Sequence, residues 1–250
     1  MRLSFLHRGL LVLLRCAAGL IVLGAIIGFR SLALPPLPDD PEQVVLQIAV
    51  SGKEDQIGRD GQIPEITLFA DGRVLFVQQD EDYTLHVREA RIGTDRASRW
   101  LARAGRKLGR GPDRRHEEGC MDCTEITVSW WTSEGVRRVS TYGSRWYTSP
   151  FFTLKDDLYA EALQAAHPYR PDRVVLMAAP ISPITTAEPW PADLPQLPPP
   201  EPGRHYGSTL VTGVKALDLA DRVPYRTPHL YVQNGQHYVV RVKPDLPILP

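Results

Sequence analysis

The stretch ITLFADGRVLFV, residues 66–77, decides the predicted fold. Two apolar runs flank Asp71-Gly72, and Asp-Gly between such runs is a strong hairpin signal, because a type I′ turn needs positive φ at both central positions. Pairing across this turn sets large apolar side chains opposite one another: Leu68 with Leu75, and Phe69 with Phe76. Since both faces of the hairpin are then apolar, we expect it at the centre of a sheet or against a helix.

Around this hairpin the chain predicts the order hairpin, helix, hairpin, helix. Further strands are expected at 44–50, 83–90, 124–131 and 136–142. Apolar residues at helical spacing predict a helix over 94–108 with Thr94 as its cap, and a capping box at Thr153 and Asp156 predicts a second helix over 153–167, which Pro168 stops. The predicted class is therefore α+β.

Prolines mark the connectors. The chain has 250 residues and 23 prolines, of which four lie in 35–41 and eleven in 168–202. Residues 178–203 are too rich in proline for a helix or a central strand, so we expect a polyproline-like strap or a loose linker. A small strand–helix–hairpin piece follows, and Asn234-Gly235 is its hairpin signal. We expect this piece to pack on the first domain, because about 45 residues are few for independent stability.

The N-terminus reads as a membrane signal. Residues 1–34 hold four arginines and no acid, and residues 10–29 are apolar apart from Arg15, which is long enough for a transmembrane helix. The flanking charges place the N-terminus in the cytoplasm and the main domain outside, at the cell membrane. The alternative is a signal peptide cleaved after Ala33, which predicts a secreted protein. Gly24 and Gly28 form a GxxxG motif, typical of helix dimers, although glycine is common in such helices.

These observations divide the chain into five predicted segments. They are a signal anchor at 1–34, a proline-rich stalk at 35–43, an α+β domain at 44–170, a proline-rich connector at 171–203 and a small α/β extension at 204–250. The 29 basic and 29 acidic residues balance, which argues against a nucleic-acid partner.

Cys120 and Cys123 form a CxxC motif that precedes a predicted strand. A redox-active CxxC opens a helix, so this context favours a structural disulfide in an oxidising compartment. Free thiols, redox catalysis and a metal site stay open, and a metal would recruit His116 with Glu117, Glu118 or Asp122. A structural zinc site needs four ligands, and we therefore predict neither a metal nor any other cofactor.

One face of the first predicted helix is rich in arginine. Its members recur at steps of three and four residues: Arg96, Arg99, Arg103, Arg106 and Arg110. The plain interpretation is a solvated helix face paired with the acidic run at 80–82. The functional interpretation is a site for anionic lipid headgroups or an acidic protein partner, because arginine suits phosphate and carboxylate groups.

No catalytic motif is recognisable. The chain lacks GxSxG, HExxH, Walker and GxGxxG patterns, and its seven histidines are scattered. The sequence therefore favours a membrane-anchored, extracytoplasmic binding or cell-envelope accessory protein without catalysis. The alternative is an extracytoplasmic hydrolase whose active-site residues are dispersed along the chain.

Several stretches together resemble uncharacterised bacterial membrane-anchored or secreted proteins. They are ITLFADGRVLFV, TEITVSWWT, YRPDRVVLMA, the PWP at 189–191 and YVVRVKPDLP. The element order of residues 62–167 also resembles emfourins, inhibitors of thermolysin-like metallopeptidases. This second resemblance implies a peptidase-inhibitor role as a further alternative, and it assigns no functional residue.

Overall fold

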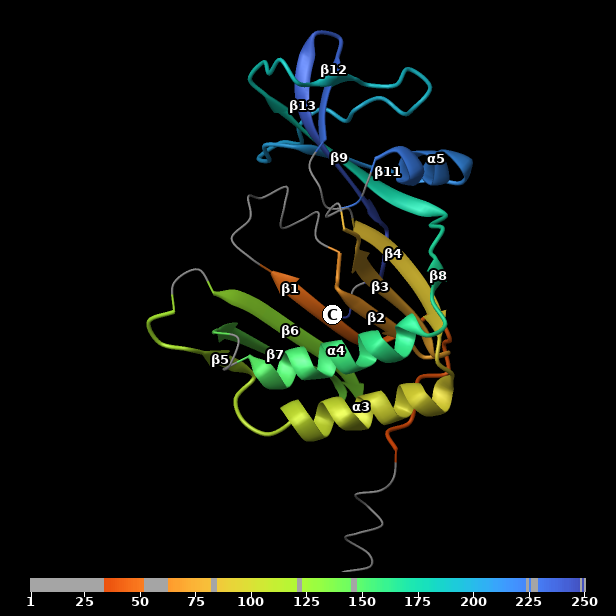
Figure 1. Ribbon diagram of the computed structural model, residues 1–250, viewed down its shortest axis with the longest axis vertical. Helices are drawn as coiled ribbons and strands as arrows, with labels where there is room; N and C mark the ends of the chain where they lie inside the picture. Colours follow the sequence, from red (N-terminus) through yellow and green to blue (C-terminus); the bar gives the residue numbers. More distant parts are fainter. Residues whose placement is uncertain are drawn as a thin grey trace, which may run out of the picture. The chain divides into compact units, whose positions relative to one another are not determined.

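Two β-sheets dominate the computed structural model, which describes residues 34–51, 63–81, 85–120, 123–144, 148–223, 225, 229–247 and 249 (Figure 1). The larger sheet has the order β5-β7-β6-β1-β2-β3-β4-β8 and the smaller sheet β10-β12-β13-β9-β11. The strands of the larger sheet are β1 (Val44–Ser51), β2 (Ile66–Phe69), β3 (Arg73–Gln79), β4 (Leu85–Arg91), β5 (Arg114–His116), β6 (Thr124–Thr132), β7 (Gly135–Gly143) and β8 (His167–Pro168). Those of the smaller sheet are β9 (Arg173–Ile181), β10 (Glu188–Pro189), β11 (Gly207–Thr212), β12 (His229–Gln233) and β13 (Gln236–Pro244).

The predicted class, α+β behind a transmembrane helix, is wrong. The described residues form mostly β-sheet, with three short helices: α3 (Thr94–Leu108), α4 (Ser149–Leu163) and α5 (Val214–Arg222). No helix in these residues is long and apolar enough to cross a membrane, so they give the assignment as a transmembrane protein no support. The predicted span, the Gly24–Gly28 pair and the cleavage site after Ala33 lie outside the described residues.

The hairpin at 66–77 forms, but its predicted register is wrong. Leu68 pairs with Val74 and not with Leu75. Phe76 pairs with Ile66 and not with Phe69. Gly72 has a φ of 80°, while Asp71 does not have positive φ. The turn therefore has three residues, and Leu68 and Leu75 face opposite sides of the sheet. A shift of one residue exchanges the faces, since side chains alternate along a strand.

Helices α3 and α4 lie side by side over one face of the larger sheet (Figure 1). The residues predicted as the apolar stripe of the first helix are all buried there: Ala97, Trp100, Leu101, Ala104 and Leu108. Trp130 of β6 lies beneath them at 2% exposure, and Phe76 of β3 makes an edge contact with Tyr159 of α4, with ring centroids 5.1 Å apart. The helical periodicity thus marks the first hydrophobic core.

The predicted helix starts need correction. Gly93, with a φ of 83°, is the N-cap of α3, and Thr94 makes no capping bond. Helix α4 begins at Ser149, four residues earlier than predicted, with Pro150 in its first turn. Thr153 is then inside the helix, where its Oγ1 donates to the carbonyl of Ser149 at 2.8 Å. Proline suits this first turn because its missing N–H has no intrahelical partner there.

The opposite face of the larger sheet is apolar on β2, β3 and β4, and it shares a second core with the smaller sheet. Phe69, Leu75 and Val87 belong to the same buried cluster as Leu176 of β9 and Val240 of β13. The C-terminal strands thus bury the part of this face that β2, β3 and β4 form. The predicted domain boundaries within this region stay predictions.

The proline-rich segment between β9 and β11 is an irregular strap that contains the two-residue strand β10. Strand β9 includes Pro180. The pairing of β9 with β11 ends at Ala178, so no hydrogen bond to β11 requires the N–H that Pro180 lacks. The prediction that residues 178–203 contain no central strand is therefore wrong at its start. Further along, Trp190, Leu194 and Leu197 are buried in the second core.

The Asn234-Gly235 hairpin forms as predicted. Gln233 pairs with Gln236, and the two loop residues have φ values of 52° and 78°. Positive φ at both positions is the requirement of a type I′ turn. This turn joins β12 to β13 and places β13 beside β9 at the centre of the smaller sheet.

Candidate binding surfaces

The predicted arginine face lies on α3, and the structure divides its five members into two groups. Arg96 pairs with Glu161 of α4 at 3.2 Å, and Arg103 forms an ion pair with Asp157. Both pairs cross between the two helices. They tie α3 to α4, so these two arginines are occupied within the fold.

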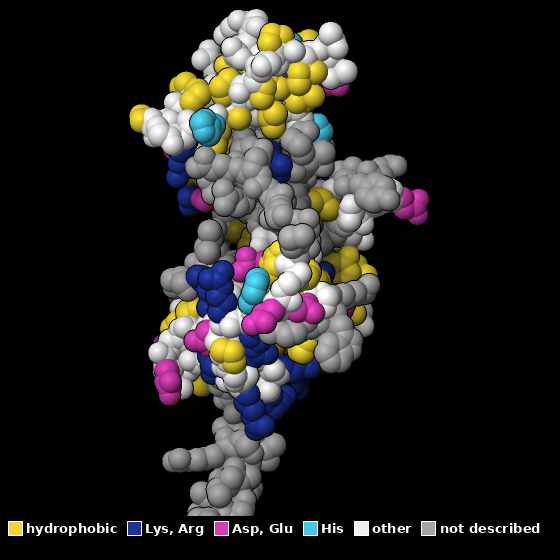
Figure 2. Space-filling view, turned by 90° about the vertical axis from the view of Figure 1, so that its left-hand side faces the viewer, with side chains coloured by type: hydrophobic (Ala, Val, Ile, Leu, Met, Phe, Trp, Pro, Cys, Tyr) yellow, Lys and Arg dark blue, Asp and Glu magenta, His cyan; other side chains and the backbone are white. Residues whose placement is uncertain are grey.

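The other three arginines, Arg99, Arg106 and Arg110, are exposed and make no ion pair within the described ranges. Arg99 and Arg106 are seven residues apart, about two turns, and therefore lie on one side of α3. Arg110 follows just after the helix end. We call these three residues the basic face. Figure 2 shows Lys and Arg side chains, in dark blue, gathered on the lower part of the described molecule.

Arg115 fixes the backbone that carries the end of the basic face. Its guanidinium donates to the carbonyl of Leu108 at 3.0 Å and to that of Arg110 at 2.7 Å. Carbonyls at a helix C-terminus have no intrahelical partner, and a cationic side chain satisfies them well. The chain after α3 is therefore held in place, and Arg110 projects from an ordered segment.

The predicted disulfide candidates lie next to β5 and β6. The Sγ atoms of Cys120 and Cys123 form a disulfide, with Cα atoms 5.9 Å apart. A ligand atom of Glu117 lies within 4.8 Å of both sulfurs. His116, the other metal ligand considered from the sequence, stacks on Tyr142 instead, with ring centroids 5.1 Å apart. The redox state of the cysteines in solution stays a prediction.

Hydrogen bonds fix the segment around these cysteines. The backbone N–H and the hydroxyl of Ser144 both donate to the Glu117 carboxylate, the hydroxyl at 3.1 Å. The N–H of Cys123 donates to the hydroxyl of Tyr142 at 3.1 Å. Glu117, Cys120 and Cys123 are all half-buried. The carboxylate and the sulfurs are thus held together by the end of β7.

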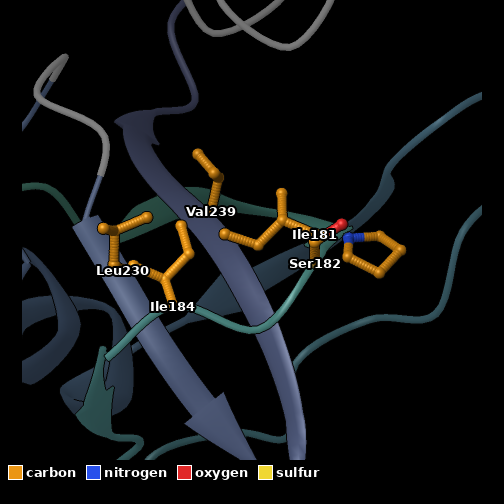
Figure 3. Close-up of a pocket in the computed structure, with 6 residues that line it drawn as sticks. Ile181, Ser182, Ile184, Leu230 and Val239 are labelled. Atoms are coloured by element: carbon orange, nitrogen blue, oxygen red, sulfur yellow. The ribbon is translucent and has the colours of Figure 1, made fainter. Parts of the chain in front are cut away.

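The smaller sheet has an apolar groove that was not among the predicted sites. The groove has a volume of about 780 Å³ and is lined by Pro180, Ile181, Ser182, Ile184, Leu230 and Val239. Figure 3 shows these side chains coming from β12, β13 and the segment at the end of β9. Leu230 pairs with Val239, so both side chains lie on the same face of the sheet. The apolar run Leu230-Tyr231-Val232 in a predicted strand was the available signal, but the pairing of β13 with β9 was not predictable.

A polar groove on β1, β6 and β7, on the face of the larger sheet opposite α3 and α4, was also not predicted. It has a volume of about 390 Å³, and its lining includes Gln47, Thr127, Ser129 and Arg138. The end of the described chain crosses it: Gln47 accepts from the N–H of Leu249 at 3.4 Å, and Arg138 donates to the Leu249 carbonyl at 2.9 Å. Nothing in the sequence brings Gln47 and Leu249, about 200 residues apart, into contact.

Within the described residues, the two grooves lack the side chains that most often act as general bases or nucleophiles, although Glu125 lines the polar groove. Neither the apolar nor the polar groove has a histidine or cysteine in its lining. Burial raises the pKa of Tyr225 and lowers the pKa of His229. Tyr225 belongs to the second core, and His229 packs beside Tyr231 with ring centroids 6.2 Å apart. These perturbed groups therefore reflect packing, and neither lines the two grooves.

No protein-family model, curated protein or solved structure matches the chain. The resemblance to bacterial envelope proteins and the emfourin-like element order stay predictions.

Proposed function

We propose that this chain is a non-catalytic binding protein whose basic face docks an acidic segment of a partner protein. The observation that carries the proposal is the exposure of Arg99, Arg106 and Arg110 without ion pairs in the described part of the chain. Arg96 and Arg103 are neutralised by α4, whereas Arg99 and Arg106 of the same helix and Arg110 just beyond its end are exposed. Arginine binds carboxylates through two parallel hydrogen bonds, which gives both charge and geometric recognition.

The support of the helix favours a binding role. The apolar stripe of α3 is fully packed against the larger sheet, so the helix that carries the basic face is already ordered before any partner arrives. A preorganised surface loses less conformational entropy on binding. Arg115 extends this order beyond the helix end to Arg110.

The lack of apolar side chains on the exposed side of α3 favours a protein over a lipid surface. Within the described residues, the exposed large hydrophobic side chains are Leu34, Leu163, Ile184, Leu210 and Val214, and none belongs to α3. Helices that lie on membranes insert apolar residues between the acyl chains, in addition to contacting headgroups with basic ones. The basic face offers charged groups without such apolar residues, which suits an acidic protein segment better than a membrane.

A charge-reversal experiment tests the proposal. Binding of the full chain to a fluorescent polyglutamate peptide is measured by anisotropy, for Arg106→Glu/Arg110→Glu and for a control with the same change of charge, Arg170→Glu/Lys215→Glu. Both control residues are exposed and lie outside α3. We expect about tenfold weaker binding in the first variant, a loss of about 1.4 kcal/mol, and less than a twofold change in the control.

Two results would contradict the proposal. If both variants weaken binding equally, the attraction depends on net charge and not on the basic face. If the chain instead binds anionic lipid vesicles and not the peptide, and Arg106→Glu/Arg110→Glu abolishes vesicle binding, the basic face recognises headgroups. Raising the salt concentration should weaken specific binding in either case, because exposed charges are screened.

A further inference from the structure

We propose that Cys120, Cys123 and Glu117, once the disulfide is reduced, bind a thiophilic divalent cation of the Zn²⁺ class. This inference is independent of the basic face. It rests on three potential ligand atoms, two sulfurs and one carboxylate oxygen, that lie within 4.8 Å of one another. Thiolate sulfur selects Zn²⁺ over harder cations, and carboxylate oxygen is an accepted additional ligand.

The spacing of the ligand atoms suits a tetrahedral site. With Zn–S bonds of about 2.3 Å and a Zn–O bond of about 2.1 Å, ligand atoms of a tetrahedral site lie about 3.5–3.8 Å apart. The ligand atoms of Glu117, Cys120 and Cys123 lie within 4.8 Å of one another, so no pair is more than about one ångström farther apart than in such a site. An adjustment of this size is within reach of the cysteine side chains, because the two sulfurs separate once their bond is broken.

The Glu117 carboxylate is already oriented toward this role. Both donors of Ser144 hold it, and the N–H of Glu117 donates to the carbonyl of Tyr142 at 2.9 Å, which anchors its backbone to β7. Ligating carboxylates in metal sites are themselves hydrogen-bonded by neighbouring groups, which fix their direction. Each Glu117 oxygen keeps a further lone pair for a cation.

The cysteines are supported by the same strand. The N–H of Cys123 donates to Tyr142, whose ring is fixed in turn by its stack on His116. The N–H of Cys120 donates to the carbonyl of Glu117 at 3.4 Å, so the first cysteine is tied to the carboxylate's own residue. The structure thus positions all three ligands through one short segment and one strand end.

Reduction of the disulfide consumes two electrons and two protons, and metal binding releases two protons. A dithiol reductant transfers two electrons and two protons to the Cys120–Cys123 bond, gives two thiols and is itself oxidised to a disulfide. Zn²⁺ then binds the two thiolates, and the two thiol protons are released to solvent. Three protein ligands leave the fourth position of a tetrahedral ion to water or to a bound partner. In the oxidised protein, Cys120 and Cys123 offer no thiolate.

Cobalt spectroscopy on the full chain tests the site. The Cys16→Ser background removes the third cysteine, and the protein is treated with a phosphine reductant and titrated with Co²⁺ and then with Zn²⁺. We expect a thiolate-to-cobalt charge-transfer band that saturates at one equivalent in reduced protein, is absent in oxidised protein and is displaced by Zn²⁺. Cys120→Ser and Cys123→Ser should each abolish the band.

The carboxylate is tested by a matched pair of variants. Glu117→Gln should weaken Co²⁺ binding at least tenfold, whereas Glu118→Gln, at the exposed neighbouring position, should leave it unchanged. Circular dichroism of each variant confirms that it is folded. A reduced protein that gives no charge-transfer band would overturn the proposed site. Equal affinities for Glu117→Gln and Glu118→Gln would also overturn it, because the site would then lack its third protein ligand. The polyglutamate assay is unaffected by either result.

Discussion

The two sheets are covered by different kinds of structure. The larger sheet covers one face with two regular helices, α3 and α4, whereas the smaller sheet is covered by α5 and by an irregular proline-rich strap. Helices present apolar residues at a fixed period, so their buried face is readable from the sequence. The strap buries Trp190, Leu194 and Leu197 at steps of four and three residues, but the prolines between them exclude the helix that this spacing would otherwise indicate. A covering layer therefore does not need regular secondary structure, and apolar spacing alone does not show which structure it has.

The helix-covered core should respond most strongly to truncation. Trp130 is 2% exposed and lies between β6 and the helices. We expect Trp130→Ala to lower the free energy of unfolding by about 4 kcal/mol, because it loses transfer free energy and leaves a cavity. Urea denaturation monitored by circular dichroism measures this change. Trp131→Ala, at the half-buried neighbouring position, serves as the control and should cost less than half as much.

The strap should behave as part of the core, with a smaller effect. Trp190 makes an edge contact with Tyr231, with ring centroids 4.9 Å apart, and its Nε1 donates to the carbonyl of Pro195 at 2.9 Å. We expect Trp190→Ala to cost about 3 kcal/mol and Trp190→Phe about 1 kcal/mol, measured by the same denaturation experiment. A cost below about 0.5 kcal/mol for the alanine variant would mean that the strap is a loose linker and would break the comparison.

Two glycines test how closely the layers approach. A Cβ at Gly207 would lie 1.9 Å from the carbonyl oxygen of Pro199, so the backbone of the strap or of β11 would have to move. We expect Gly207→Ala to cost about 2 kcal/mol. Gly105 in α3 is the control, because the nearest atom to its Cβ is 3.8 Å away. Gly105→Ala should stabilise the protein by about 0.5 kcal/mol, since alanine favours the helix. Thermal unfolding that shifts both variants in one direction would contradict this assignment.

The smallest effect should be a loss of stability in acid. Burial lowers the pKa of His229 in the folded state below its ordinary value of 6.5, so the unfolded chain binds the proton more readily. The free energy of unfolding should therefore fall as pH drops through about 6.5 and level off below the folded-state pKa. Denaturation at pH 8 and pH 5 measures this change. His229→Gln should reduce it, while His167→Gln, at an exposed position, should not.

Local sequence signals were reliable only where no distant contact competed with them. Asn234-Gly235 forms the expected type I′ turn. At Asp71-Gly72 the Asp71 side chain instead accepts from the N–H of Arg73 at 2.9 Å, and Gly72 packs so closely on Gly93 that a Cβ there would lie 2.4 Å from its carbonyl carbon. Gly93 begins α3, so a tertiary contact selected the three-residue turn and shifted the register.

The candidate surfaces were also only partly predictable from the sequence. Four of the five arginines lie in α3 and Arg110 follows its end, but their spacing could not show that Arg96 and Arg103 face acids of α4. The CxxC motif marked the cysteines, whereas the approach of Glu117 depends on the end of β7. Both grooves combine residues from strands that are distant in the sequence, and no local pattern records such pairing.

The strand order of the smaller sheet also bears on how the chain is synthesised. Strand β9 lies between β11 and β13, and its apolar residues include Val174, Leu176 and Ala178. Residues emerge from the ribosome in chain order at about 5–20 per second. The edge of β9 that pairs with β13 therefore stays unpaired for several seconds, until residues 236–244 have been synthesised. An unpaired apolar edge invites aggregation, and proline blocks the pairing of neighbouring segments. The prolines that follow β9 would thus protect the nascent chain before they cover the finished sheet.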